Sequence, residues 1–323
     1  MSYRSECKYR KLIVTSSKIF LTMGNYSRRQ FLERSLQIAA AGALGATALT
    51  SCTTPRTVRP GSKMRFGLVT YLWGKDWDLP TLIRNCETTN VLGVELRTQH
   101  AHGVESNLNS QQRREVRKRF DDSPVTLVGL GTNFSFHYAD RERLQKDIEG
   151  AKQYVKLSQD VGGSGVKVKP NALPDGVAAE KTIEQIGKTL NELGRFGADY
   201  GQQIRVEVHG RKTQQLPIMK QIFDVADHPN IGICWNSNPR DLDGQGLEYN
   251  FNLVKDRFGD TVHVRELNNG EYPYQQLINL FVEMNYKGWI LLEARTKPKD
   301  RIKALAEQRS LFEQMVAKGS KLA

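Results

Sequence analysis

Polar side chains stand in regular rows on several apolar stretches of the chain. In QIRVEVH, alternation puts Arg205, Glu207 and His209 on one face, while the two valines take the other. The same alternation puts Lys167 and Lys169 on one face of GVKVK. Carboxylate, imidazole and amine groups are common proton carriers in enzymes. Because a polar row inside a buried strand is costly unless it is paired or used, these rows favour a site.

Three later stretches place polar residues at or near the end of an apolar run. NIGICWN ends in Asn236, TVHVREL carries His263 and Arg265 on one face, and WILLE ends in Glu293. A buried strand that ends in a carboxylate, beside a strand that carries a histidine, is similar to the last two strands of a (β/α)8 barrel. In such a barrel, inward side chains at the C-terminal ends of different strands meet in one pocket.

The elements expected to position these residues are eight strands that alternate with eight helices along the chain. They occupy about 250 residues, which favours one parallel (β/α)8 TIM barrel, an α/β fold, over an open sheet. No Gly-x-Gly-x-x-Gly follows a strand, so a dinucleotide-binding fold is not expected. The predicted strands are 64–73, 93–97, 125–132, 165–169, 203–209, 230–236, 261–267 and 289–292, and the predicted helices are 79–89, 111–120, 140–161, 180–200, 216–226, 247–258, 274–285 and 302–317.

The stretch HVRELNNGEY, followed by a helix and then NYKGWILLE, resembles the C-terminal signature of the sugar phosphate isomerase/epimerase family. This family has a xylose isomerase-like barrel and includes the AP endonuclease family 2 proteins. Its pattern is a His-x-Lys/Arg-Asp/Glu strand, a helix, and Gly-Tyr-x-Gly-x-apolar-Glu. Asn285 replaces the first of these glycines, and the resemblance extends over most of residues 64–316. The residues that fit the pattern are His263, Arg265, Glu266, Tyr286, Gly288 and Glu293.

The resemblance implies one divalent metal ion, Mn, Mg, Co or Zn, held by residues from four strands. The family's Glu, Asp, His and Glu ligands fall on Glu207, Asn236, His263 and Glu293. Asn236 departs from the family, which usually has Asp there. An amide oxygen can bind a hard cation but contributes no negative charge. The departure therefore implies weaker metal binding, or its loss.

The resemblance also implies acid/base roles for Glu207 and Glu293. In the family's epimerases, one glutamate removes a proton next to a carbonyl, and the other returns a proton from the opposite face. The metal polarises the carbonyl and the adjacent hydroxyl, which stabilises the enediolate. The alternative is that either glutamate is a buried partner of Arg205 or Arg295.

Six residues are candidates for contact with substrate. His100 and His102 lie on a loop after the second strand, where a pocket rim belongs, although a solvated loop would carry them as well. Either lysine of GVKVK could bind substrate oxygens or offset the glutamates, and the histidine of VEVH could instead be a hydrogen-bonded core group. The full set is His100, His102, Lys167, Lys169, His209 and Arg265.

The first fifty-one residues have the character of an export signal. SRRQFL resembles a twin-arginine motif, residues 36–50 have the length of a signal h-region, and LTSC resembles a lipobox with Cys52 as the lipidated residue. An uncleaved anchor is the alternative, and residues 1–22 precede a second possible start at Met23. We expect a signal at 1–51, a tether at 52–62 and a TIM barrel at 63–323. These features predict an exported, periplasmic protein anchored to a membrane by lipid.

The net charge of +12 raises nucleic acid as a partner, but its distribution argues against one. Residues 1–51 hold eight Lys/Arg and two Glu, so half of the excess lies in the presumed signal. The remainder carries a modest excess, and its basic run at 111–119 is expected to be a solvated helix face. Cys86 and Cys234 lack the spacing of a metal or redox motif and are expected to pack in the core.

Export makes a sugar phosphate an unexpected substrate, because sugar phosphates are scarce outside the cytoplasm. The first interpretation is therefore a metal-dependent isomerase or epimerase of a non-phosphorylated sugar or keto-sugar. A leaving group on the next carbon would turn the same chemistry into β-elimination, so a lyase of 3-keto-glycosides is an alternative. A non-catalytic sugar-binding barrel is another, favoured by Asn236. A DNA-repair endonuclease is disfavoured by export and by the few histidines, and the oligomeric state is not predicted.

Overall fold

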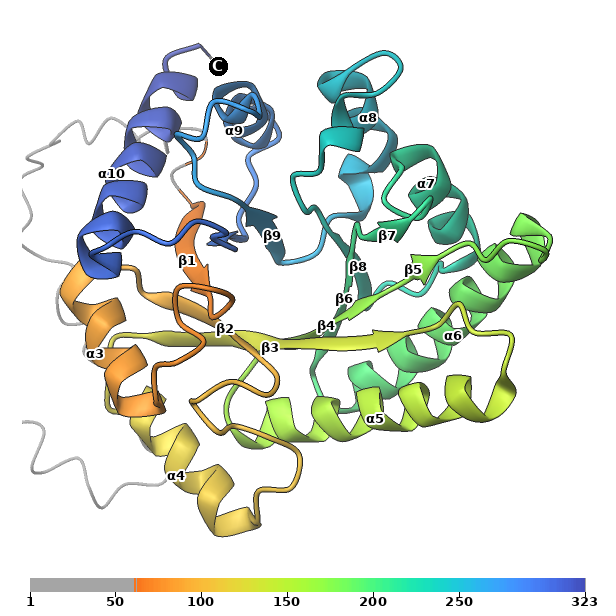
Figure 1. The fold of residues 1–323 in the computed structure, drawn as a ribbon, viewed down its shortest axis with the longest axis horizontal. Helices are drawn as coiled ribbons and strands as arrows, with labels where there is room; N and C mark the ends of the chain where they lie inside the picture. The colour runs from red at the N-terminus through yellow and green to blue at the C-terminus, as the bar shows by residue number, and fades with distance from the viewer. Residues whose placement is uncertain (1–60, 62, 323) are drawn as a thin grey trace, which may run out of the picture. The chain divides into compact units, whose positions relative to one another are not determined.

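Apolar strands alternate with helices along the part of the chain that the computed structural model describes, residue 61 and residues 63–322 (Figure 1). The predicted signal with Cys52, and nearly all of the predicted tether, lie outside the described residues. Eight strands form one parallel sheet in the order β8-β6-β4-β3-β2-β1-β10-β9. They are β1 (Arg65–Val69), β2 (Gly93–Arg97), β3 (Thr126–Ser135), β4 (Gly165–Lys169), β6 (Gln203–Glu207), β8 (Ile231–Cys234), β9 (Thr261–Val264) and β10 (Trp289–Leu292).

The two outermost strands of this order, β8 and β9, approach each other and nearly close the sheet into a barrel. The His263 N–H donates to the Trp235 carbonyl at 2.7 Å, and the Ser237 hydroxyl donates to the His263 carbonyl at 3.1 Å. A parallel bridge joins Ile233 to Phe258 before β9 begins. The predicted (β/α)8 TIM barrel is therefore confirmed.

Helices surround the sheet (Figure 1). Several of them begin at a polar cap. Asp78, Asp140 and Asp300 each accept hydrogen bonds from the backbone of the helix that they precede, and Asn109 forms a capping box. No helix in the described part of the chain is long and apolar enough to cross a membrane. The helices are α3 (Leu79–Thr89), α4 (Ser110–Asp121), α5 (Arg141–Asp160), α6 (Ala179–Asp199), α7 (Leu216–Val225), α8 (Leu247–Val254), α9 (Tyr274–Glu283) and α10 (Arg301–Gly319), with short 3-10 turns η2 (Pro239–Leu242) and η3 (Lys255–Arg257).

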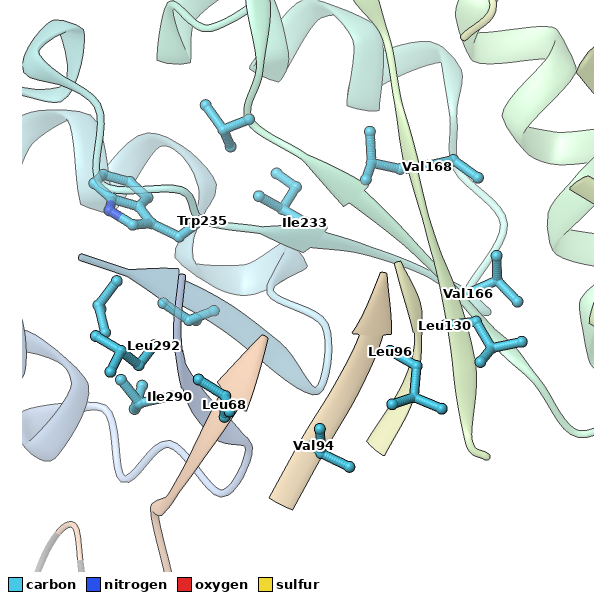
Figure 2. Close-up of a cluster of buried hydrophobic side chains, with 14 of the residues drawn as sticks. Leu68, Val94, Leu96, Leu130, Val166, Val168, Ile233, Trp235, Ile290 and Leu292 are labelled. Carbon is cyan, nitrogen blue, oxygen red and sulfur yellow. The ribbon is translucent and has the colours of Figure 1, made fainter. Parts of the chain in front are cut away.

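Alternation along the strands separates two apolar clusters. The larger cluster lies between the strands and the helices and includes Leu68, Leu130 and Leu292 (Figure 2). A small cluster on the opposite face of the strands forms the floor of the barrel interior, and Tyr71 packs against it. Cys86 and Cys234 are buried free thiols, as expected for core residues. The floor cluster consists of Val69, Val128, Trp289 and Leu291.

Arg205 also belongs to the barrel floor and is fully buried. Its guanidinium donates to the Val128 carbonyl and to the Ser164 hydroxyl, both at 2.8 Å. Two glycines make room for it, because a Cβ at Gly129 or Gly165 would lie 2.7 Å from guanidinium atoms. Its ion pair is with Asp260, at 3.7 Å, and within the described residues Arg205 forms no ion pair with Glu207 or Glu293.

A two-residue ladder that the sequence did not predict joins the ends of two barrel strands. β5 (Asn171–Ala172) follows β4, β7 (Gly210–Arg211) follows β6, and the two pair in parallel. Gly210 has a φ of 101°, and a Cβ there would lie 1.9 Å from the Asn171 carbonyl oxygen. Only glycine fits this approach. The ladder fixes the chain directly after Lys169 and His209.

Candidate active site

Six strands or the residues directly after them bring polar side chains into the barrel, one step above the apolar floor. All are at most 6% exposed, so water does not solvate them freely. We call this set the inner layer. It consists of Glu95 on β2, Lys167 on β4, Glu207 on β6, Asn236 after β8, His263 on β9 and Glu293 after β10.

Three members of the inner layer could hold a metal ion. One ligand atom from each of Glu207, His263 and Glu293 lies within 4.8 Å of the other two. The Nδ1 atom of His263 is buried and has no hydrogen-bond partner. Within the described residues, the Glu293 carboxylate makes no hydrogen bond or ion pair. Two carboxylates and an imidazole are ligands that Mn, Co and Zn accept, so these residues fit a divalent metal.

Asn236, the fourth predicted ligand, lies beside the other three. Its side-chain amide donates to Glu207 Oε1 at 2.9 Å. The amide is thus within reach of the site but is used to hold a carboxylate in place. A ligand role for Asn236 stays a prediction.

Lys167 lies against Glu207 and not at the rim of a substrate pocket. It is fully buried, and its Nζ donates to Glu207 Oε2 at 2.5 Å and to the Thr132 carbonyl at 3.0 Å. Burial alone would raise the pKa of Glu207, but Lys167 and then Lys169 hold it well below its usual range. Glu207 is therefore a carboxylate at neutral pH. Of the two roles that the sequence left open for Lys167, the geometry supports the one that offsets a glutamate.

Glu95 is a member of the inner layer to which the sequence analysis assigned no role. It is fully buried, and its Oε1 lies 3.3 Å from His263 Nε2. A carboxylate behind a ligating histidine fixes the ring orientation and leaves the other nitrogen for the metal. Gly131 makes room for it, because a Cβ there would lie 2.5 Å from Glu95 Oε1. The alternation of GVELR, with two charged residues on one face of a buried strand, was the signal that could have revealed it.

The charge of Glu95 also affects the protonation of His263. Burial lowers the pKa of His263, but Cys234 and Glu95 outweigh burial and hold the pKa well above its ordinary value. Metal binding by His263 would therefore release a proton.

Two residues beyond the inner layer, four more side chains project from the strand ends. We call them the outer layer: Arg97, Lys169, His209 and Arg265. Lys169 Nζ lies 3.9 Å from Glu207 Oε2, and burial lowers the pKa of Lys169 to about 8. Burial also lowers the pKa of His209 to about 4, so its imidazole is neutral at neutral pH.

The two histidines of the loop after β2 differ in their contacts. His102 is buried, donates from Nε2 to the Arg97 carbonyl at 2.7 Å, and accepts at Nδ1 from the Val104 N–H at 3.0 Å. Both of its ring nitrogens thus order the loop. His100 Nδ1 lies 3.2 Å from the Thr70 hydroxyl, and burial lowers its pKa to about 4. Substrate contact by either residue stays a prediction, and the geometry favours His100.

A match to a family model decides the classification. The model of the xylose isomerase-like TIM barrel family (AP_endonuc_2) matches residues 83–315. The chain belongs to this family. The resemblance expected from the C-terminal signature is thereby confirmed. No curated protein matches the sequence.

Solved structures similar to this xylose isomerase-like barrel include sugar epimerases. An L-ribulose 3-epimerase has a TM-score of 0.67 at 12% identity, over 80% of this chain and 96% of its own. The 3-keto-D-glucoside 4-epimerase YcjR from E. coli has a TM-score of 0.65 at 13% identity, over 78% and 100%. The zinc-bound IOLI protein has a TM-score of 0.66 at 14% identity, over 79% and 98%. At these identities the likeness shows the fold that this chain shares with them.

The contact between Glu95 and His263 predicts that Glu95→Gln weakens metal binding by about 10- to 100-fold, because the imidazole loses its charged partner. Titration of the full chain with Mn²⁺ or Zn²⁺, followed by calorimetry at constant pH, measures this. Glu115→Gln, on the exposed surface of α4, is the control and should bind metal as the native chain does. Equal affinity in Glu95→Gln and the native chain would show that Glu95 does not support the histidine.

Proposed function

We propose that this protein is a metal-dependent sugar isomerase or epimerase that moves a proton next to a carbonyl of a non-phosphorylated sugar or keto-sugar. The observation that carries the proposal is the convergence of Glu207, His263 and Glu293, with the buried Nδ1 of His263 free of partners. The similarity to sugar epimerases supports the same class of reaction.

Glu207, His263 and Glu293 would hold the metal, with Asn236 as a weaker fourth ligand. When bound, the metal polarises the substrate carbonyl and the adjacent hydroxyl. Glu95 orients His263, and the buried strand ends keep bulk water away from the reacting carbon.

The two glutamates divide the proton transfer. Lys167 and Asn236 keep Glu207 ionised, so Glu207 is the group that begins as base and takes the proton from carbon. Glu293 comes from β10, and β6 and β10 are not neighbours in the sheet. It can therefore deliver a proton that it takes up from water to the other face of the same carbon, which inverts the centre, and Glu207 then releases the first proton to water. Return of the proton to the adjacent carbon would instead give an isomerase.

Deuterium incorporation from D₂O tests the proposal. The Mn²⁺-loaded full chain should exchange the proton next to the carbonyl of D-fructose, L-ribulose or a 3-keto-glucoside, as followed by NMR. Glu207→Gln and Glu293→Gln should each slow exchange by about 100-fold or more, because general base or acid catalysis is lost. Glu115→Gln should leave the rate unchanged.

The same spectra separate the alternatives. Release of the aglycone from the 3-keto-glucoside would identify a β-eliminating lyase. Sugar binding without exchange or elimination in any of these compounds would overturn the catalytic proposal and leave a sugar-binding barrel.

We also propose that the protein is exported by a twin-arginine signal and anchored in the periplasm through a lipid on Cys52. The order of SRRQFL, an uncharged h-region and LTSC supports this. Metabolic labelling with a fatty acid tracer should mark the chain in the membrane fraction, and Cys52→Ser should abolish the label. A labelled Cys52→Ser chain, or a native chain confined to the cytoplasm, would contradict the proposal.

A further inference from the structure

The outer layer holds cations that the described groups around it do not neutralise. Lys169 has one ion-pair contact, at 3.9 Å to Glu207 Oε2, and that oxygen already receives Lys167 at 2.5 Å. The Lys169 side chain is only 12% exposed and makes no hydrogen bond within the described residues. It is therefore a mostly desolvated ammonium group whose nearest carboxylate is already paired.

Arg97 is the second such cation. It is 9% exposed and donates from Nη2 to the neutral amide oxygen of Asn133 at 3.1 Å. Its Nε is buried without a hydrogen-bond partner. Its guanidinium lies 5.7 Å from the centre of the Tyr71 ring, and no carboxylate of the described residues lies within ion-pair distance of it. A buried guanidinium with an unused donor is costly unless a ligand satisfies it.

His209 completes a group with these two cations. Its Nδ1 is buried without a partner, and Lys169 and Arg97 both lower its pKa, after the larger effect of burial. Arg97 lowers the pKa of Lys169 as well. The three side chains therefore share one region at the ends of β2, β4 and β6. The acidic groups that act on this region are Glu207 and Glu293 of the inner layer.

The proposed function leaves these two cations without a counter-charge. In the inner layer, Lys167 is paired with Glu207, and the metal would be held by Glu207, His263 and Glu293. Proton transfer adds no net charge, because the proton that leaves carbon neutralises Glu207 as the enediolate forms. Arg265, the third cation of the outer layer, acts on Asp241, whose pKa burial raises and Arg265 lowers. An anionic group on the substrate would supply the counter-charge that Arg97 and Lys169 lack.

We propose that the substrate is a sugar acid, a carbohydrate with a carboxylate that Arg97 and Lys169 bind while His209 donates a hydrogen bond to it. A carboxylate carries a single charge and matches the planar donors of a guanidinium. A carboxylate also agrees with the proposed function and export, because sugar phosphates are scarce outside the cytoplasm. Because Lys169 lies close to Glu207, the carboxylate sits near the carbon that exchanges its proton.

Binding of matched, unreactive ligands tests this proposal. Calorimetry with the metal-loaded full chain compares D-gluconate, the neutral D-glucitol and D-glucitol 6-phosphate. Gluconate should bind at least about tenfold more tightly than glucitol, since hydrogen bonds to charged groups contribute that much. Gluconate should also bind more tightly than the phosphate ester.

Variants assign the preference to residues. Lys169→Met and Arg97→Met should each reduce the preference for gluconate to about threefold or less while binding of glucitol changes little. Lys169→Arg keeps the charge and should retain the preference, which guards against a folding defect in the methionine variants. Lys156→Met, on the exposed surface of α5, is the control.

Equal binding of gluconate and glucitol would overturn the proposal, as would a preference that survives both methionine variants. Tighter binding of the phosphate ester would overturn the carboxylate assignment. Metal content and deuterium exchange measured on the same samples keep the two proposals apart. Exchange with neutral keto-sugars but no preference for gluconate contradicts the sugar acid alone. A preference for gluconate without metal or exchange supports the anion site and contradicts the proposed function.

Discussion

Three buried carboxylates inside the barrel require positively charged partners. The arrangement of the other polar groups of the site follows from this constraint. Glu95, Glu207 and Glu293 are each at most 6% exposed, where an unpaired anion is strongly disfavoured. Lys167 neutralises Glu207, and His263 faces Glu95. Glu293 has no such partner within the described residues. A divalent cation between Glu207, His263 and Glu293 meets this need, which is why the donor set points to a metal.

The two-residue period of the strands places positively charged side chains next to these carboxylates. Arg205, Glu207 and His209 share one face of β6 and its extension, and they occupy the floor, the inner layer and the outer layer in turn. Arg205 is tied to backbone and hydroxyl groups of the floor, Glu207 to Lys167, and His209 lies toward the open end. A register shift by one residue would exchange these side chains for the valines. The apolar face that packs against the helices therefore fixes the level of each charged side chain along the barrel axis.

Much of the fold could be predicted from alternation alone. A run whose apolar residues share one face shows where a strand lies in the sequence and which of its side chains point into the barrel. The ends of the strands were less predictable. β6 ends at Glu207 and β9 at Val264, earlier than the expected 209 and 267, although the Val208 N–H still donates to the Cys234 carbonyl. β3 continues to Ser135 instead of ending at 132. The ladder of β5 and β7 is too short to leave a periodic signal.

Within the site, residue types and faces could be predicted, but partners could not. Alternation placed Lys167 and Glu207 inward, yet their contact depends on the register between β4 and β6. The contact of Glu95 with His263 joins β2 to β9, which are not neighbours in the sheet. Such contacts depend on the closure of the barrel, which no local pattern contains. For the same reason the sequence left two roles open for Lys167, and its contact with Glu207 supports the one that offsets a glutamate.

The most direct test of the account is the metal stoichiometry of the full chain, measured by elemental analysis after incubation with Mn²⁺, Co²⁺ or Zn²⁺ and removal of the excess. The account predicts about one ion per chain in the native protein, and its loss in both Glu293→Gln and His263→Gln. A native chain that retains no ion, or an ion that persists in both variants, would contradict the assignment of these residues to a metal site.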